Sequence, residues 1–127
     1  MGNMFYGCIS LVSLNISNFK TYSVTNMENM FYNCYSLISL VIDKFDVSSI
    51  DTNYDNIFFN CKSLISLNLT NFYSFSESTS RLFSNLNSHF TYCIDNEKNY
   101  NFLSELQNYH NNCSDLYIRF NSKKYIV

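Results

Sequence analysis

Cysteine and histidine are the residues of this chain with the clearest potential for chemistry. Cys8, Cys34 and Cys61 recur at spacings of 26 and 27 residues, each three residues after a phenylalanine. A zinc site needs about four donors that converge on one point, whereas thiols at a constant repeat spacing form a line. We therefore interpret these three cysteines as small apolar side chains of a buried core.

A second group of possible ligands lies towards the C-terminus. His89-x₃-Cys93 and His110-x₂-Cys113 each place a histidine close to a cysteine, which is a pattern that zinc sites use. Both histidines stand in asparagine-rich polar surroundings, where a histidine is usually a plain surface residue. We keep zinc as an alternative and predict no metal and no cofactor.

The acidic residues imitate a calcium loop without completing it. Asp51-x-Asn53-x-Asp55 matches the first ligands of an EF-hand, but the sixth place is Asn56 instead of glycine and the twelfth is Lys62 instead of glutamate. With only 2 glycines the chain cannot form a glycine-rich phosphate loop, and no Ser/His/Asp arrangement is recognisable. We therefore expect that the protein is not an enzyme.

Composition excludes two further classes of function. The chain has 127 residues, 46% of them hydrophobic, and a net charge of −2. Its 8 basic residues are scattered without a run, so we expect no nucleic-acid partner. No apolar stretch reaches the length of a membrane span, so membrane association would come only through parts absent from this chain.

The cysteines at constant spacing belong to a sequence repeat, and the structure of that repeat must set their positions. The segments MFYGCISLVSL (4–14), MFYNCYSLISL (30–40) and IFFNCKSLISL (57–67) share one pattern. Met27, Met30, Phe31 and Cys34 have i, i+3, i+4, i+7 spacing, which predicts a short helical segment, and the alternation that follows predicts a short strand. A repeat of this length is typical of a solenoid in which each copy forms one coil.

The extent of the repeat predicts that the chain has two parts, a solenoid and a C-terminal segment. A fourth, decayed copy at 82–86 extends the solenoid, which we place at 1–86. The remaining segment, 87–127, is predicted to hold a helix over 100–111 and short strands after Cys113. The first copy begins in mid-coil, since Met1 aligns with Met27, so we expect a chain truncated at its N-terminus.

The pattern M-x-x-M-F-x-x-C-x-S-L-x-S-L-x-L-S-x-F closely resembles the BspA-like leucine-rich repeats found in surface proteins of mycoplasmas, other bacteria and protists. The third copy departs from it at Tyr54 and Ile57, which are still apolar. The resemblance implies an α/β fold, a right-handed leucine-rich-repeat solenoid with a strand and a short helical segment per coil. The residue pattern after position 86 adds a small α+β segment to this fold. The matching residues are Met1, Met4, Phe5, Cys8, Leu11, Leu14, Ile16 and Phe19; Met27, Met30, Phe31, Cys34, Leu37, Leu40, Ile42 and Phe45; and Tyr54, Ile57, Phe58, Cys61, Leu64, Leu67, Leu69 and Phe72.

The same resemblance implies a non-enzymatic protein at the cell surface or outside the cell, which adheres to or binds a protein or glycan on another cell or matrix. An intracellular scaffold in the cytoplasm, with the same solenoid, is the alternative. Binding would use the residues between the inward strand positions, because solenoids commonly bind through exposed faces. These residues are Ser13, Asn15 and Ser17; Ser39, Val41 and Asp43; and Ser66, Asn68 and Thr70.

Cys93 and Cys113 lie outside the repeat. Because the family is displayed outside cells, the resemblance favours a disulfide between them, which oxidising compartments allow. Two free thiols in a cytoplasmic protein are the alternative.

Overall fold

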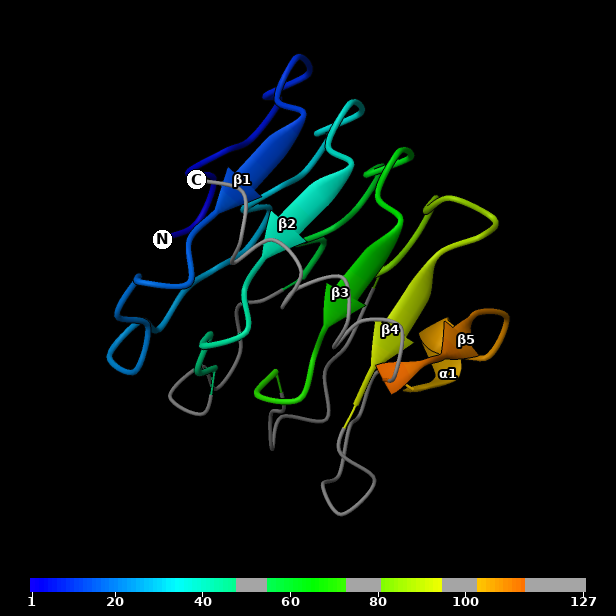
Figure 1. Ribbon diagram of the computed structural model, residues 1–127. Coiled ribbons are helices and arrows are strands. Elements are labelled where there is room, and N and C mark those ends of the chain that lie inside the picture. The colour runs from blue at the N-terminus through cyan, green and yellow to red at the C-terminus, as the bar shows by residue number, and fades with distance from the viewer. Residues whose placement is uncertain (48–54, 73–80, 95–102, 114–127) are drawn as a thin grey trace, which may run out of the picture.

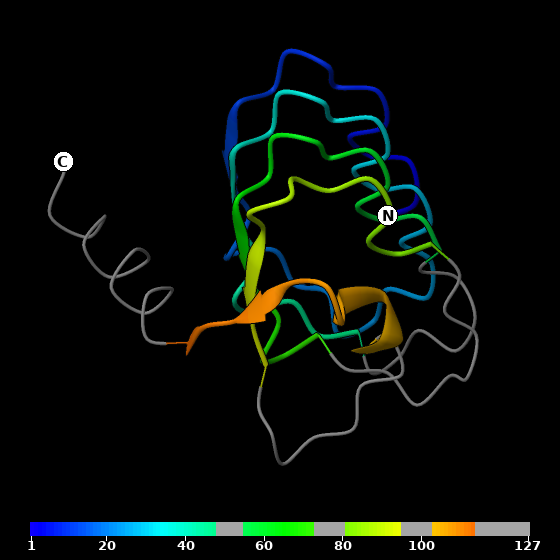
Figure 2. The same ribbon diagram turned by 90° about the vertical axis from the view of Figure 1, so that its right-hand side faces the viewer.

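The computed structural model describes residues 1–47, 55–72, 81–94 and 103–113. Four stretches of chain follow the same path, one stacked on the next, and we call them coils 1 to 4: residues 1–26, 27–47, 55–72 and 81–94. Each coil has a strand on one side and a series of turns, the turn segment, on the other (Figure 2). The repeat seen in the sequence is therefore a repeat of backbone path.

The strands form one parallel sheet in chain order, β1-β2-β3-β4-β5 (Figure 1). Their bounds are Ser13–Asn15, Ser39–Val41, Ser66–Asn68, Thr91–Cys93 and His110–Asn111. Ser13 pairs with Ser39, Ser39 with Ser66, and Ser66 with Thr91. The sheet register thus equals the sequence period, so equivalent residues of successive coils lie side by side.

The helical segment expected in each coil is wrong for the described residues, which form turns there. Three amide-to-carbonyl bonds span three residues, from Met30 to Met27, from Cys34 to Phe31 and from Leu37 to Cys34. Asn29 and Asn33 have φ values of 54° and 60°, and a positive φ belongs to the third position of a type II turn and interrupts a helix. The i, i+3, i+4, i+7 spacing therefore came from successive turns that each return an apolar residue to the core.

Positive φ values recur at the same two places of every coil. The pairs are Asn3 with Gly7, Asn29 with Asn33, Asn56 with Asn60, and Arg81 with Asn85. Asparagine and glycine tolerate this conformation better than other residues. The abundance of asparagine in the repeat therefore has a backbone cause at these positions.

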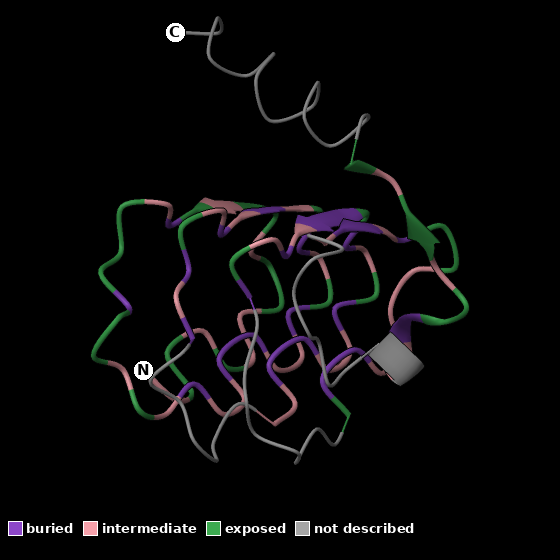
Figure 3. Cartoon of the chain, turned by 90° about the horizontal axis from the view of Figure 1, so that it is seen from below, coloured by how far each residue is buried: buried purple, intermediate pink, exposed green. Residues whose placement is uncertain are grey.

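The core is a set of side-chain stacks that run along the coils. Phe5, Phe31, Phe58 and Phe83 stack in sequence with ring centroids 5.4, 5.8 and 5.5 Å apart. Leu37, Leu40, Leu64 and Leu67 beside them are at most 1% exposed. In Figure 3 buried stretches of the chain, coloured purple, recur from coil to coil. Burial between neighbouring coils is what stabilises a unit that is too small to fold alone.

The coil pattern continues beyond Leu86, where the sequence pattern fades. β4 pairs with β3 over its three residues, and Phe90 is fully buried. The predicted helix over 100–111 is shorter, because α1 spans Leu103–Leu106 and a turn follows it. The short strands predicted after Cys113 lie outside the described residues, and the domain division at 86 stays a prediction.

Candidate binding faces

The outward sheet positions expected to bind a partner differ in exposure along the stack. Ser13 and Asn15 are exposed, Ser39 and Val41 are intermediate, and Ser66 is buried with 7% exposure. Of the four other residues of the predicted face, Ser17, Asp43, Asn68 and Thr70, all are intermediate. The structure therefore aligns the predicted residues in rows but offers Ser66 little access to a partner. We call these outward sheet positions the polar rows.

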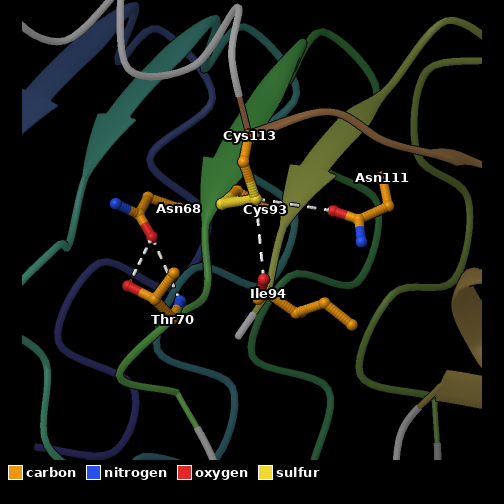
Figure 4. The surroundings of a disulfide bond; sticks show 6 residues. All are labelled: Asn68, Thr70, Cys93, Ile94, Asn111 and Cys113. Carbon is orange, nitrogen blue, oxygen red and sulfur yellow. Dashed lines mark hydrogen bonds between the residues drawn. A yellow bond between two sulfur atoms is a disulfide. The ribbon is translucent and has the colours of Figure 1, made fainter. Parts of the chain in front are cut away.

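Two asparagines of the polar rows are held in fixed orientations. The Oδ1 atom of Asn15 accepts the backbone N–H of Ser17 at 3.0 Å. The Oδ1 atom of Asn68 accepts both the backbone N–H and the hydroxyl of Thr70, at 3.0 and 2.8 Å. The Asn68 side-chain nitrogen points away from Thr70 (Figure 4). Hydrogen bonds of this kind join a side chain to the residue two positions later in the chain. They hold the two amides in one orientation before any partner binds.

Coil 2 interrupts this polar arrangement. Val41 occupies the place of Asn15 and Asn68, as the sheet register shows for Asn15. Asp43 has a buried Oδ1 atom with no hydrogen-bond partner in the described part of the chain, while its backbone carbonyl accepts the side-chain N–H of Asn71 at 2.6 Å. The polar rows are thus not uniform from coil to coil.

A row of apolar side chains lies directly before the strands, and sequence reasoning missed it. Val12, Ile38 and Ile65 are 52%, 43% and 38% exposed. They stand at equivalent positions, each one residue before β1, β2 or β3. We call these three residues the apolar row. The sequence did contain a signal for this row, because the x position of S-L-x-S-L is valine or isoleucine in all three copies.

The backbone holds the apolar row firmly. The carbonyl of Val12 accepts the N–H of Ile38 at 2.8 Å, and the carbonyl of Ile65 accepts the N–H of Thr91 at 3.0 Å. The β-branched side chains also have few rotamers. A partner that buried them would therefore lose little conformational entropy in ordering them.

Tyr35 and Lys62 extend the exposed surface three residues before the apolar row. Tyr35 is 38% exposed, and the Nζ atom of Lys62 lies 5.4 Å from the centroid of its ring. A cation within about 6 Å of an aromatic centroid is attracted by the ring. Tyrosine is among the residues that most often anchor interfaces. The exposed surface at this corner is therefore mixed, with one aromatic residue and one positive charge.

The apolar row ends at coil 4. The residue equivalent to Ile65 is Phe90, because β3 and β4 pair Ser66 with Thr91. Phe90 is fully buried, and its ring meets that of Tyr109 edge to face at 5.4 Å. The ring centroid of Phe90 also lies 6.4 Å from that of Phe83 in the core, and its N–H donates to the carbonyl of Asn87 as that of Leu64 does to Cys61. Coil 4 therefore turns this residue inward, and the exposed apolar position is not repeated there.

Cys93 and Cys113 form a disulfide, with Cα atoms 4.6 Å apart. Cys93 pairs with Asn68 in the sheet, so it belongs to the outward positions of the polar rows. The Sγ atom of Cys113 lies 3.5 Å from the carbonyl oxygen of Ile94 (Figure 4). The bond fastens the segment after β5 to the outward face of β4, and sulfurs joined in this way are not available as thiolate ligands for zinc.

The three cysteines of the repeat lie in line and do not converge. The Sγ atoms of Cys34 and Cys61 point to the carbonyl oxygens of Phe5 and Phe31, at 3.1 and 3.2 Å. Burial raises the pKa of the Cys34 thiol to about 11 and that of Cys61 to about 12. Both thiols stay protonated near neutral pH and are therefore poor nucleophiles.

The other groups considered for chemistry do not assemble in the described part of the chain. His89 and His110 are both exposed, and no group of three His, Cys, Asp or Glu residues there could hold a metal ion. Of the calcium-like motif, Asp51 and Asn53 lie outside the described residues. Within the residues that the structure describes, no helix is long and apolar enough to cross a membrane.

The parallel strands, the constant register and the continuous stacks define a repeat protein built from stacked coils. The chain belongs to the family described as Mycoplasma protein of unknown function, DUF285, which matches residues 1–122. No curated protein and no solved structure matches the chain.

Proposed function

We propose that this chain is a BspA-like leucine-rich-repeat protein that is displayed on the cell surface and binds a protein or glycan without catalysing a reaction. The observation that carries the proposal is the apolar row, Val12, Ile38 and Ile65. Singly exposed apolar residues are normal on any protein. The apolar row is different, because its three residues occupy the same place in three successive hydrogen-bonded coils. Paired strands lie only about 4.8 Å apart, so these side chains form a continuous strip.

The polar rows lie beside this strip and supply a different kind of contact. Ser13, Ser39 and Ser66 directly follow Val12, Ile38 and Ile65 in the sequence, and the side-chain amides of Asn15 and Asn68 are already oriented. Interfaces commonly combine an apolar centre with a polar rim. We therefore propose that the apolar row provides affinity and the polar rows provide selectivity.

The disulfide supports the proposed location. Disulfides persist in oxidising surroundings and are rare in the cytoplasm. Mapping the cysteines of the protein isolated from its cells without reductant tests this point. We expect a Cys93–Cys113 bridge, and two free thiols would instead favour the cytoplasmic scaffold.

Binding is tested with an array of glycans and a panel of immobilised extracellular-matrix proteins, with albumin as the blank. The full chain is compared with the double variant Ile38→Ser/Ile65→Ser and with Lys44→Ser, which changes an exposed residue outside both kinds of row. We expect saturable binding that the double variant weakens at least ~10-fold, or ~1.4 kcal/mol, and that Lys44→Ser leaves unchanged. Equal binding by all three proteins, or none above albumin, would contradict the proposal.

A further inference from the structure

Three aromatic rings stack in a row along the turn segments, outside the buried core. The ring centroids of Tyr6 and Tyr32 are 5.1 Å apart and those of Tyr32 and Phe59 are 4.8 Å apart, with interplanar angles of 2° and 10°. Tyr6 is exposed, and the other two residues are intermediate. We call these three residues the ring row. The turn segments lie on the side of the coils away from the strands (Figure 2), so the ring row is distinct from the apolar row.

The backbone places Ser84 of coil 4 where the next ring of this row would stand. The carbonyl of Phe59 accepts the N–H of Asn33 at 3.0 Å. In the next coil the carbonyl of Ser84 accepts the N–H of Asn60, also at 3.0 Å. Ser84 is therefore the equivalent of Phe59, but its side chain is only a hydroxymethyl group. Among the described residues, no ring covers the face of Phe59 that is turned away from Tyr32.

A row of side-chain amides ends at the same coil. Asn60 donates its side-chain N–H to the Oδ1 atom of Asn33 at 2.9 Å, and Asn85 donates to that of Asn60 at 2.8 Å. Each amide thus donates to the preceding coil and accepts from the following one. Asn85 is exposed, and its own Oδ1 atom has no hydrogen-bond partner in the described part of the chain. An unused acceptor therefore stands directly after Ser84, next to the end of the ring row.

We propose that the place over Ser84 binds a tyrosine or tryptophan side chain of a partner protein, which becomes a fourth ring in the ring row. Aromatic pairs prefer centroid separations of about 4.5–7 Å, and the coils repeat at about 4.8 Å. A ring held at the level of coil 4 therefore stacks on the uncovered face of Phe59. Tyrosine and tryptophan carry a hydrogen-bond donor on the ring, and the Oδ1 atom of Asn85 is the acceptor for it.

The open position of this place favours a ring that a protein carries. A free aromatic molecule would gain one stacking contact and one hydrogen bond, which is less than the freedom of motion that it would lose on binding. A side chain of a partner protein shares this loss with the other contacts of its interface. A sugar can also lie on a ring face, but it is puckered and has several hydroxyl groups to satisfy. The parallel rings of the row match a flat ring better.

The proposal is tested with short random peptides displayed on phage. The peptides are selected on the full chain after depletion on the variant Ser84→Tyr, in which a ring of the chain itself fills the place. We expect the enriched peptides to share a tyrosine or tryptophan. Synthetic copies should bind Ser84→Ala, the matched control, as tightly as the full chain. They should bind Phe59→Leu about 2- to 10-fold more weakly, because this variant loses the ring face and leaves coil 4 unaltered.

Amide chemical shifts of the full chain locate the bound peptide. Ser84 and Asn85 should shift most, and shifts centred on Tyr6 or on Ile38 would overturn the proposal. Enriched peptides without an aromatic residue, or no enrichment after depletion, would overturn it as well. Glycans that bind the full chain but not Ser84→Tyr would show that the place takes a sugar instead. Peptides that bind through the apolar row are removed in the depletion, so these results do not depend on the function proposed above.

Discussion

The carboxylate of Glu105 takes the place of a missing fifth coil for the backbone N–H of Phe83. The bond is 2.9 Å long, and it ends a series in which the backbone N–H of the equivalent phenylalanine in each turn segment donates to a carbonyl of the next coil. The other carboxylate oxygen, Oε1, is buried and has no hydrogen-bond partner among the residues that the structure describes. Glu105 is therefore a cap for one backbone group, and its position depends on α1.

Replacing this carboxylate tests the cap. Glu105→Ala removes the carboxylate that accepts the N–H of Phe83, so the free energy of unfolding should fall by about 1–3 kcal/mol, whereas Glu105→Gln keeps an acceptor and should cost less. Urea denaturation followed by circular dichroism measures both. A loss below ~0.5 kcal/mol for Glu105→Ala would mean that water replaces the carboxylate at this end.

Reduction of the Cys93–Cys113 bond should destabilise the C-terminal end of the stack. The two residues are 20 apart in sequence, and closing a loop of this size stabilises a folded chain by about 3 kcal/mol. We expect dithiothreitol to lower the midpoint of thermal unfolding. The double variant Cys93→Ser/Cys113→Ser should already have the lower midpoint, and dithiothreitol should not change it. If dithiothreitol lowered the midpoint of this variant as well, the loss of stability would not come from the Cys93–Cys113 bond.

The repeat could be predicted from the sequence because equivalent residues of successive coils occupy equivalent places in the core. Phe31 and Phe58, Cys34 and Cys61 lie in register at 0% exposure, as their common offset required. The helical segment was misjudged because turns that return every third or fourth residue to the core produce the same apolar spacing as a helix. The deciding residue was Asn33, since a positive φ at a fixed place in each coil excludes a helix. Asparagine alone does not reveal its φ in a sequence rich in that residue.

The candidate site was harder to predict than the core. The strand alternation correctly placed Asn15 and Asn68 on the outward side, but neighbouring side chains decide whether such a residue is accessible, and Ser66 is buried. Ile38 and Ile65 were overlooked because exposed apolar residues look like core residues in a sequence. The cap could not be predicted for another reason: Glu105 and Phe83 are 22 residues apart in the sequence, and no local pattern links them.

The buried thiols predict a loss of stability at high pH. Burial raises the pKa of Cys34 to about 11 and of Cys61 to about 12, against about 8.5 for an unfolded cysteine. The folded state therefore holds these protons to higher pH, so the contribution is complete below pH ~8.5 and is lost as the pH rises towards the folded pKa values.

Between pH 8 and 10 the free energy of unfolding should fall by up to ~1.4 kcal/mol per pH unit for each thiol. The double variant Cys34→Ala/Cys61→Ala, measured by urea denaturation across the same range, should show a flatter dependence. An identical slope in the variant would assign the loss to other groups.

A row of asparagine side chains along the turn segments can be extended by one residue. The Oδ1 atom of Asn33 accepts the side-chain N–H of Asn60 at 2.9 Å, and that of Asn60 accepts from Asn85 at 2.8 Å. In coil 1 the equivalent residue is Gly7, with φ at 67° and no atom within 4 Å of an added Cβ. Because asparagine tolerates this conformation, Gly7→Asn should place a fourth amide in the row.

We expect Gly7→Asn to raise the free energy of unfolding by about 0.5–1.5 kcal/mol, since it adds one hydrogen bond and restricts the unfolded chain. Gly7→Ala is the matched control, because it also adds a Cβ at positive φ but no amide, and should be destabilising. Urea denaturation of the three proteins separates the two effects. If Gly7→Asn were no more stable than Gly7→Ala, hydrogen bonding along the row would contribute nothing, and the asparagines would serve only the backbone conformation.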